Sequence, residues 1–304
     1  MSIVVRGVSK VYGSQKALDN VSFEVKTGEI VAFLGPNGAG KSTMMKIITG
    51  FIPATSGTVL VNGTDVSSGG REIRKITGYL PENNPLYPEM YVREYLSFVA
   101  SMYGSRRKQG SAVNDIIGLT GLAPEANKKI GALSKGYRQR VGLAQALIHD
   151  PDVLILDEAT TGLDPNQIIE IRNLIREAGK EKTVMLSTHI MQEAEAICGR
   201  IIIIDRGVIV ADEEKDKIHQ KIKSPKQLIR AGFDRETSDS ELLGIPGIKS
   251  AVLTRQGEWL LEAESGEDIR PAIFAFAVRN NLTVLSLQKE ESNLEEIFRQ
   301  LTGR

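Results

Sequence analysis

The order of apolar runs along the chain predicts an α/β core with a helical insertion, followed by a small C-terminal α+β domain. In residues 1–219, short all-apolar strands alternate with amphipathic helices, which is typical of a buried and mostly parallel sheet. Residues 84–150 interrupt this alternation, because three of their segments have helical apolar spacing and strand signals vanish. The expected domains are therefore residues 1–219, with a helical subdomain at about 84–150, and residues 220–304.

The composition indicates a folded protein and excludes several classes. Of 304 residues, 41% are hydrophobic and 25% are charged, so an unstructured chain is not expected. The single cysteine excludes a disulfide framework and a cysteine-based zinc site. Basic and acidic residues both number 38, so no nucleic-acid partner is expected. No apolar run approaches the ~20 residues that span a bilayer, which predicts a cytosolic or cytosol-facing protein without its own anchor.

The N-terminal elements lead up to a glycine-rich loop. Short apolar segments bounded by turn residues predict strands at residues 3–8, 21–25, 30–34 and 57–62. A turn is expected at residues 18–20. The loop starts directly after the third of these strands, and residues 44–49 continue from it as a helix.

This loop has the complete sequence of a phosphate-binding loop. Its residues are Gly35, Pro36, Asn37, Gly38, Ala39, Gly40, Lys41, Ser42 and Thr43. Glycines let backbone N–H groups converge on phosphate oxygens, and the following helix points its N-terminus at the same charge. In such a loop Lys41 reaches the β- and γ-phosphates and Ser42 ligates Mg²⁺. The alternative, a chance glycine-rich turn, leaves the strand before it and the helix after it unexplained.

A second strand carries two acidic residues at its end. Residues 153–156 are apolar, and Asp157 and Glu158 follow at the carboxyl end, where sheets of this class bind ligands. Asp157 is suited to the Mg²⁺ shell, and Glu158 is suited to polarise an attacking water. The alternative is an acidic cap on the next helix, which the neighbouring phosphate-binding loop makes less favourable.

The remaining elements of residues 84–219 are predicted from their periodicity. Helices are expected at residues 92–103, 111–119, 134–149, 165–179 and 191–198. Strands are expected at residues 183–187 and 201–204.

Residues 220–304 contain no motif that assigns a role. The charged stretch 212–226 is expected to be a helix that joins the domains. Strands are then expected at 227–233, 250–255, 258–264 and 283–289, and helices at 239–243, 268–280 and 293–301. Trp259 is expected in the core of this domain.

The segment Leu133-Ser134-Lys135-Gly136-Tyr137, together with the two motifs above, carries a resemblance to a known family. The chain resembles the ATP-binding subunit of an ATP-binding-cassette (ABC) transporter, whose signature motif usually reads Leu-Ser-Gly-Gly-Gln. The resemblance covers residues 1–219 almost continuously. It implies that Ser134 and the amide of Gly136 hold the γ-phosphate of an ATP bound on the opposite protomer. Lys135 and Tyr137 depart from the usual motif, whereas the two phosphate-facing residues are kept.

The same resemblance implies roles for other single residues. Tyr12 matches an aromatic that stacks on adenine, and Asp164 belongs to a loop that crosses the dimer interface. His189 matches the switch histidine that contacts the γ-phosphate. Glu82 stands where the family usually has a glutamine that touches Mg²⁺ and senses the membrane partner, and its anionic oxygen can still ligate Mg²⁺.

Taken together, motifs and resemblance give the expected site. Lys41, Glu158 and His189 are expected to be catalytic, and Ser42, Glu82 and Asp157 to hold Mg²⁺. The implied activity is ATP hydrolysis that drives separate membrane-spanning subunits, contacted near Glu82 to Tyr95, with two copies dimerising around MgATP. The implied location is peripheral, at the cytoplasmic face of the bacterial inner membrane.

A finer assignment also follows from resemblance. A glutamate at position 82 resembles the export-type branch of this family, whose membrane subunits are separate chains. Several segments resemble the ATP-binding subunit associated with bacterial gliding motility. Two alternatives stay open: a soluble ABC-type ATPase not coupled to transport, and an ATP-gated scaffold. Intact Lys41, Asp157, Glu158 and His189 count against the scaffold.

Overall fold

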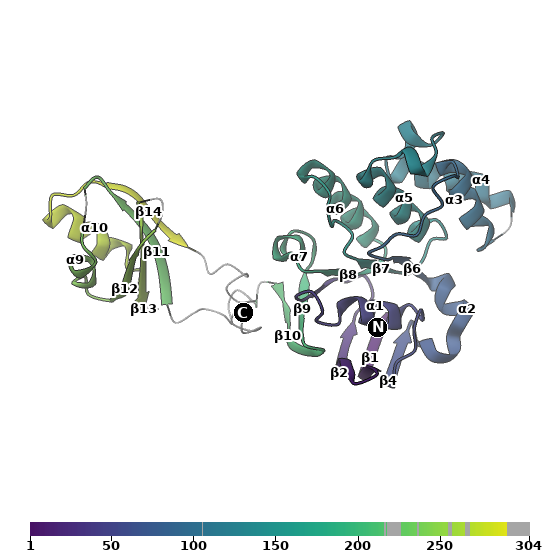
Figure 1. Ribbon diagram of the computed structural model, residues 1–304, viewed down its shortest axis with the longest axis horizontal. Coiled ribbons are helices and arrows are strands. Elements are labelled where there is room, and N and C mark those ends of the chain that lie inside the picture. Colours follow the sequence, from purple (N-terminus) through teal and green to yellow (C-terminus); the bar gives the residue numbers. More distant parts are fainter. Residues whose placement is uncertain are drawn as a thin grey trace. The chain divides into compact units, whose positions relative to one another are not determined.

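The computed structural model describes residues 1–104, 106–215, 217, 226–235, 237–254, 257–264 and 268–290. The chain divides into two compact units, Met1–Lys215 and Asp216–Arg304 (Figure 1).

The first unit is built on a six-stranded sheet with the order β10-β9-β3-β8-β7-β6. Its strands are β3 (Ile30–Leu34), β6 (Thr77–Leu80), β7 (Val153–Asp157), β8 (Thr183–Thr188), β9 (Arg200–Asp205) and β10 (Val208–Glu214). All pairings are parallel except that of β10 with β9. Every residue of β7 and β8 is buried, which explains the apolar runs at residues 153–156 and 184–186.

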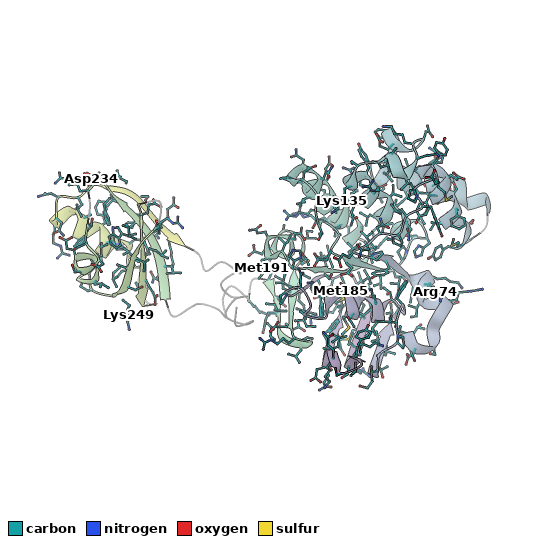
Figure 2. All side chains as sticks on the ribbon, in the orientation of Figure 1. Arg74, Lys135, Met185, Met191, Asp234 and Lys249 are labelled. Atoms are coloured by element: carbon teal, nitrogen blue, oxygen red, sulfur yellow. The ribbon has the colours of Figure 1, made fainter. Side chains whose placement is uncertain are left out.

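Helices cover both faces of this sheet. Helix α1 (Lys41–Ile48) lies below it in Figure 1, and α6 (Pro165–Gly179) and the helical insertion lie above it. Helix α7 (Met191–Ile197) connects β8 to β9. Met185 of β8 is fully buried among the packed side chains of this unit (Figure 2).

A smaller sheet with the order β2-β1-β4-β5 packs on the other side of α1. Its strands are β1 (Ile3–Tyr12), β2 (Gln15–Val25), β4 (Ser56–Val61) and β5 (Thr64–Asp65). The predicted turn at residues 18–20 is wrong, because β2 runs through it and Leu18 is fully buried. Asn20, with φ of 50°, lies instead at an irregularity where the pairing of β1 with β2 shifts register.

Helix α2 (Val66–Ile76) was not among the expected elements. Asp65 caps it by accepting a hydrogen bond from the backbone N–H of Ser67 at 2.8 Å. Gly69 and Gly70 lower its helix propensity, and Gly70 has a non-helical backbone inside it. The capping interaction and packing against β4 and β5 therefore form a helix that the local pattern conceals.

The helical insertion lies where the apolar spacing predicted it. It comprises α3 (Val92–Ser101), α4 (Arg106–Leu119), the short 3-10 turns Ala123–Glu125 and Ile130–Ala132, and α5 (Lys135–Leu147). In the described part of the chain, no helix combines the length and the apolarity needed to cross a membrane.

The hairpin of β9 and β10 corrects the prediction for the charged stretch. Residues 212–214 belong to strand β10, not to a helix. Arg206 and Gly207, with φ of 46° and 80°, form the left-handed turn that hairpins favour. Across the pair, Arg200 Nε donates to Asp212 Oδ1 at 2.6 Å, so a charged residue is held in a strand by its partner. Most of the rest of the stretch lies outside the described residues.

Gly207 ties this hairpin to the phosphate-binding loop. Its N–H donates to the carbonyl of Ala39 at 3.0 Å, and its carbonyl accepts from the N–H of Asp19 at 2.8 Å. A Cβ at Gly207 would lie 2.8 Å from the carbonyl oxygen of Ala17. The turn, the loop and strand β2 therefore meet at a position with room for glycine alone.

In its described residues, the second unit is a four-stranded antiparallel sheet with helices α9 and α10. Its elements are β11 (Lys226–Phe233), α9 (Asp239–Leu243), β12 (Ile248–Leu253), β13 (Trp259–Glu264), α10 (Arg270–Arg279) and β14 (Val284–Glu290). The strand order is β12-β13-β11-β14. Trp259 is buried in the core with Ile229, Leu261 and Ile273, as predicted. The helix expected at residues 293–301 lies outside the described residues.

Candidate functional site

The carboxyl ends of three neighbouring strands bring the predicted catalytic residues together. Strand β8 lies between β3 and β7, and the register pairs Leu34 with Thr188 and Asp157 with Ser187. The loop after β3, the acids after β7 and His189 after β8 therefore share one edge of the sheet. Ligands bind at this edge in α/β proteins.

Lys41 is buried and held by its own loop. Its Nζ donates to the carbonyl of Gly35 at 2.8 Å and to that of Pro36 at 3.2 Å. The same nitrogen lies 3.3 Å from Glu158 Oε1, and both side chains are almost fully buried. This places a fixed positive charge beside the loop.

Glycine is required where the phosphate-binding loop turns. Gly40, the residue before α1, has φ of 109°, and a Cβ there would lie 2.6 Å from the carbonyl oxygen of Ala17. Gly38 has φ of 81°. Side chains at both positions would strain a backbone whose amides a phosphate needs.

Asp157 and Ser42 form the pair suited to a divalent cation. Ser42 Oγ donates to Asp157 Oδ1 at 3.1 Å, and Ser187 Oγ donates to the same oxygen. Burial raises the pKa of Asp157, and the hydrogen bonds from the two hydroxyls partly oppose this. A cation beside this carboxylate would offset its desolvation, and its oxygen chemistry fits Mg²⁺.

The set of acids is nevertheless incomplete for a protein-only metal cage. Among the described residues, no group of three or more His, Cys, Asp or Glu side chains could hold a metal ion. Mg²⁺ characteristically binds through one or two carboxylates and completes its shell with phosphate oxygens and waters. The residues present therefore fit Mg²⁺ bound together with a nucleotide.

Glu158 is held in a strained and specific position. Its φ of 53° is left-handed, which is uncommon for a residue other than glycine and frequent at functional sites. Oε2 accepts hydrogen bonds from Thr161 Oγ1 at 2.9 Å and from His189 Nδ1 at 2.8 Å. The bond to the carboxylate places a proton on Nδ1 of His189. Glu158 thus lies between Lys41 and His189.

An open cavity of about 430 Å³ gathers most of the predicted nucleotide-binding residues. Its lining comprises Tyr12, Gln15, Ala17, Asn37, Gly38, Gly40, Lys41, Ser42, Thr43, Glu82 and Glu158. Tyr12 is half-exposed at its rim, with Lys10 Nζ 5.1 Å from the ring centroid. Gln15 and Ala17 were not predicted, because no motif marks the β1–β2 hairpin that carries them.

Ser134 and Asp164 are exposed and Gly136 is buried beside them, and none of the three is among the described residues that line this cavity. We call this trio the second surface. Ser134 caps α5 by accepting from the N–H of Tyr137 at 3.3 Å, and Asp164 caps α6 by accepting from that of Gln167 at 3.0 Å. A Cβ at Gly136 would overlap the side chain of Gln167. The N-termini of α5 and α6 are therefore packed together.

A larger cavity of about 700 Å³ adjoins the site. Ser42, Asp157 and Glu82 line it together with Lys46, Phe51, Arg74, Tyr79, Asn83, Pro85, Tyr103 and His149. Phe51 is 73% exposed, and Tyr103 stacks on His149 with ring centroids 4.0 Å apart. We call this cavity the aromatic groove.

The predicted partner segment from Glu82 to Tyr95 lies only partly in the aromatic groove. Glu82 lines it, whereas Tyr87 packs edge-on against Tyr95 at 5.9 Å and remains 55% exposed. Phe51 and Tyr103 were missed. Phe51 could have been found as an isolated aromatic just after the expected helix at residues 44–49, whereas Tyr103 lay inside the expected helix at 92–103, which ends at Ser101 in the structure.

This fold and site define a nucleotide-binding protein with a phosphate-binding loop and a helical insertion. Comparison with family models matches residues 18–161 to "ABC transporter" and residues 214–302 to "ATP-binding protein DrrA1-3-like, C-terminal domain". The chain belongs to the family of ABC transporter ATP-binding proteins.

Curated relatives match over nearly their whole length. The linearmycin resistance ATP-binding protein LnrL of Bacillus subtilis is 33% identical, over 98% of this chain and 97% of its own. The bacitracin transport ATP-binding protein BcrA of Bacillus licheniformis is 33% identical, over 100% and 98%. A Nod factor export ATP-binding protein I of Burkholderia orbicola is 33% identical, over 98% and 96%.

Solved structures match a large part of the chain. An ATP-binding cassette solved as a dimer in a post-hydrolysis state with ADP and Pi superposes with a TM-score of 0.64 at 28% identity, over 70% of this chain and 98% of that one. An ATP-binding subunit of an ABC transporter gives 0.67 at 32% identity, over 73% and 93%. The predictions of an ABC-type ATPase and of its fold are thereby confirmed.

Proposed function

We propose that this chain is the ATP-hydrolysing subunit of an exporter whose membrane-spanning subunits are separate chains. The relatives above are named for resistance, transport and export. The single observation that carries the catalytic part is the buried Glu158, strained and held by His189 and Thr161 next to Lys41. The link to gliding motility stays a prediction, since none of the three relatives above carries such a name.

In this proposal each residue of the site has a defined task. Lys41 and the loop amides bind the β- and γ-phosphates, and Ser42, Asp157 and Glu82 hold Mg²⁺, which supplies charge neutralisation when bound. Glu158 accepts the proton of the attacking water, and His189 both orients Glu158 and contacts the γ-phosphate. Tyr12 stacks on the adenine.

The second surface completes the site in a dimer. Ser134, Gly136 and Asp164 of one protomer face the ATP held by Lys41 of the other. This is supported by their separation from the nucleotide cavity and by the dimeric form of the matching cassette. Capped helix N-termini carry amides and a dipole that favour a phosphate.

The partner segment from Glu82 to Tyr95 and the aromatic groove are the proposed docking surface for a membrane subunit. Glu82 lines both the nucleotide cavity and the aromatic groove, so one side chain contacts both spaces. Exposed aromatics beside it offer contact area of the kind that interfaces use. The protein would then act at the cytoplasmic face of the bacterial inner membrane.

Dimerisation tests the shared site. In the Glu158→Gln background, ATP should produce dimers in light scattering, because bound nucleotide is not consumed. Adding Ser134→Arg should abolish the dimers but leave ATP binding to the monomer intact. Ser97→Arg, an exposed position on α3, is the matched control and should still dimerise. Loss of ATP binding in the Ser134→Arg monomer would place the signature residues in the same chain's site and refute the proposal.

A further inference from the structure

A buried carboxylate lies beneath the two loops that carry Glu158 and His189. It belongs to Glu193, the third residue of α7, and is 3% exposed. Thr160 Oγ1 donates a hydrogen bond to Glu193 Oε1, and Thr188 Oγ1 donates to Oε2 at 2.7 Å. Thr160 follows Glu158 by two positions, and Thr188 directly precedes His189. One side chain thus bridges the loop after β7 and the last residue of β8, next to His189.

The bridge fixes the backbone on both sides of His189. Thr188 Oγ1, while donating to Glu193, accepts a hydrogen bond from the N–H of Ile190 at 3.0 Å. The residues before and after the histidine are therefore attached to one hydroxyl. This limits how far the imidazole can swing from Glu158.

The bridge also restrains the strained turn at Glu158. Within that turn, the N–H of Thr161 donates to the carbonyl of Glu158 at 3.2 Å, and the N–H of Leu163 donates to that of Thr160 at 3.2 Å. A left-handed glutamate persists only where its surroundings over-determine it. The hydroxyl of Thr160 anchors the turn to α7, outside the loop itself.

A carboxylate is the side chain that this position needs. Two hydroxyls donate to it, and an ionised carboxylate accepts at both oxygens. A glutamine accepts at one oxygen and donates from its nitrogen, so it can keep the present geometry at one of the two hydroxyls. Burying a carboxylate is costly unless it is hydrogen-bonded. Packing alone does not require a carboxylate here, because an apolar side chain would fill the same space without that desolvation cost.

We propose that Glu193 is a positioning residue for ATP hydrolysis, which holds the loops of Glu158 and His189 in fixed relation across strands β7 and β8. The inference rests on the roles proposed above for those two residues. Glu193 acts on them through Thr160 and Thr188, without touching the nucleotide.

The test uses full-length protein with saturating MgATP. Glu193→Gln and Thr160→Val should each lower kcat by ~10- to 100-fold, because a displacement on the order of 1 Å costs about that much. KM for ATP should change less than ~3-fold, since Lys41 and the phosphate-binding loop are untouched. The double variant should lose less than the product of the two single effects, because both substitutions act on one bridge. Thr160→Ser keeps the hydroxyl and should restore kcat.

Two controls separate positioning from stability. Ile197→Ala removes a buried side chain of the same helix and should lower the melting temperature without lowering kcat. Glu158→Gln, measured in parallel, reports on the catalytic proposal itself. If Glu193→Gln does not fold, the comparison of kcat between Thr160→Val and Thr160→Ser tests the proposal without it.

Each outcome is decisive. Wild-type kcat in Thr160→Val, with Glu158→Gln inactive, overturns the role of Glu193. The role is also overturned if Thr160→Val and Ile197→Ala both lose kcat in proportion to their fall in melting temperature. An active Glu158→Gln instead overturns the catalytic proposal for Glu158.

Discussion

Replacing Glu158 by glutamine removes one negative charge and leaves the side-chain shape nearly unchanged. The amide oxygen can still accept hydrogen bonds from His189 and Thr161. In the wild-type protein these two residues donate to Oε2 of Glu158 at 2.8 and 2.9 Å. The amide nitrogen then replaces Oε1, 3.3 Å from Lys41, so two donors face each other. The variant therefore keeps the position of the side chain and loses its basicity.

The size of the effect follows from these contacts. General-base catalysis contributes about 10²- to 10⁴-fold, or ~3–5 kcal/mol of activation free energy. Hydrolysis should fall by that factor. Breaking a buried ion pair typically costs ~3–5 kcal/mol of folding free energy. Because Lys41 keeps its hydrogen bonds to the carbonyls of Gly35 and Pro36, we expect a smaller loss of folding free energy, about 1–3 kcal/mol.

Three measurements check this prediction: single-turnover hydrolysis, MgATP affinity by fluorescence titration, and thermal unfolding with and without MgATP. MgATP affinity should be retained, and the nucleotide should restore most of the lost stability. Glu89→Gln, which removes an exposed partner 3.1 Å from Lys129, is the control and should change neither rate nor stability. Turnover within a few-fold of wild type would remove Glu158 from the mechanism.

Three further predictions concern the partner segment and the second unit. Tyr87→Ala combined with Tyr91→Ala should weaken co-purification with the membrane subunits and leave ATP binding intact; unchanged co-purification would move the docking surface elsewhere. A chain that ends at residue 223 should fold and bind ATP, as measured by circular dichroism and nucleotide titration, and an insoluble product would contradict the predicted domain boundary. Trp259→Ala should destabilise the second unit by about 3–5 kcal/mol in denaturant unfolding without changing ATP affinity, because the side chain is buried in that unit's own core.

The parts of the fold that were predictable are those specified by neighbours in sequence. The buried strands read as apolar runs, and the phosphate-binding loop is a contiguous motif whose glycines are needed for local backbone reasons. The helices of the insertion keep regular apolar spacing. The cap residues Ser134 and Asp164 mark where α5 and α6 begin.

The parts that were missed depend on distant partners. Strand β10 contains Asp212, which reads as helix or linker until Arg200, two residues from its paired position on β9, is placed within hydrogen-bond distance. Helix α2 contains two glycines and depends on its cap and its packing. No sequence motif marks Glu193, because the two threonines that it binds lie 33 and 5 positions away. No local pattern reports such contacts.

The position of β3 between β8 and β9 determines when the nucleotide site can form during folding. The phosphate-binding loop follows β3, yet β3 pairs with strands more than 150 residues later, and Ala39 is bound by Gly207. Contacts this distant in sequence form late, since their loop-closure entropy must first be overcome. A ribosome-bound chain therefore carries its loop long before it can hold ATP, and nucleotide binding by nascent chains should begin only after about residue 210 has left the exit tunnel.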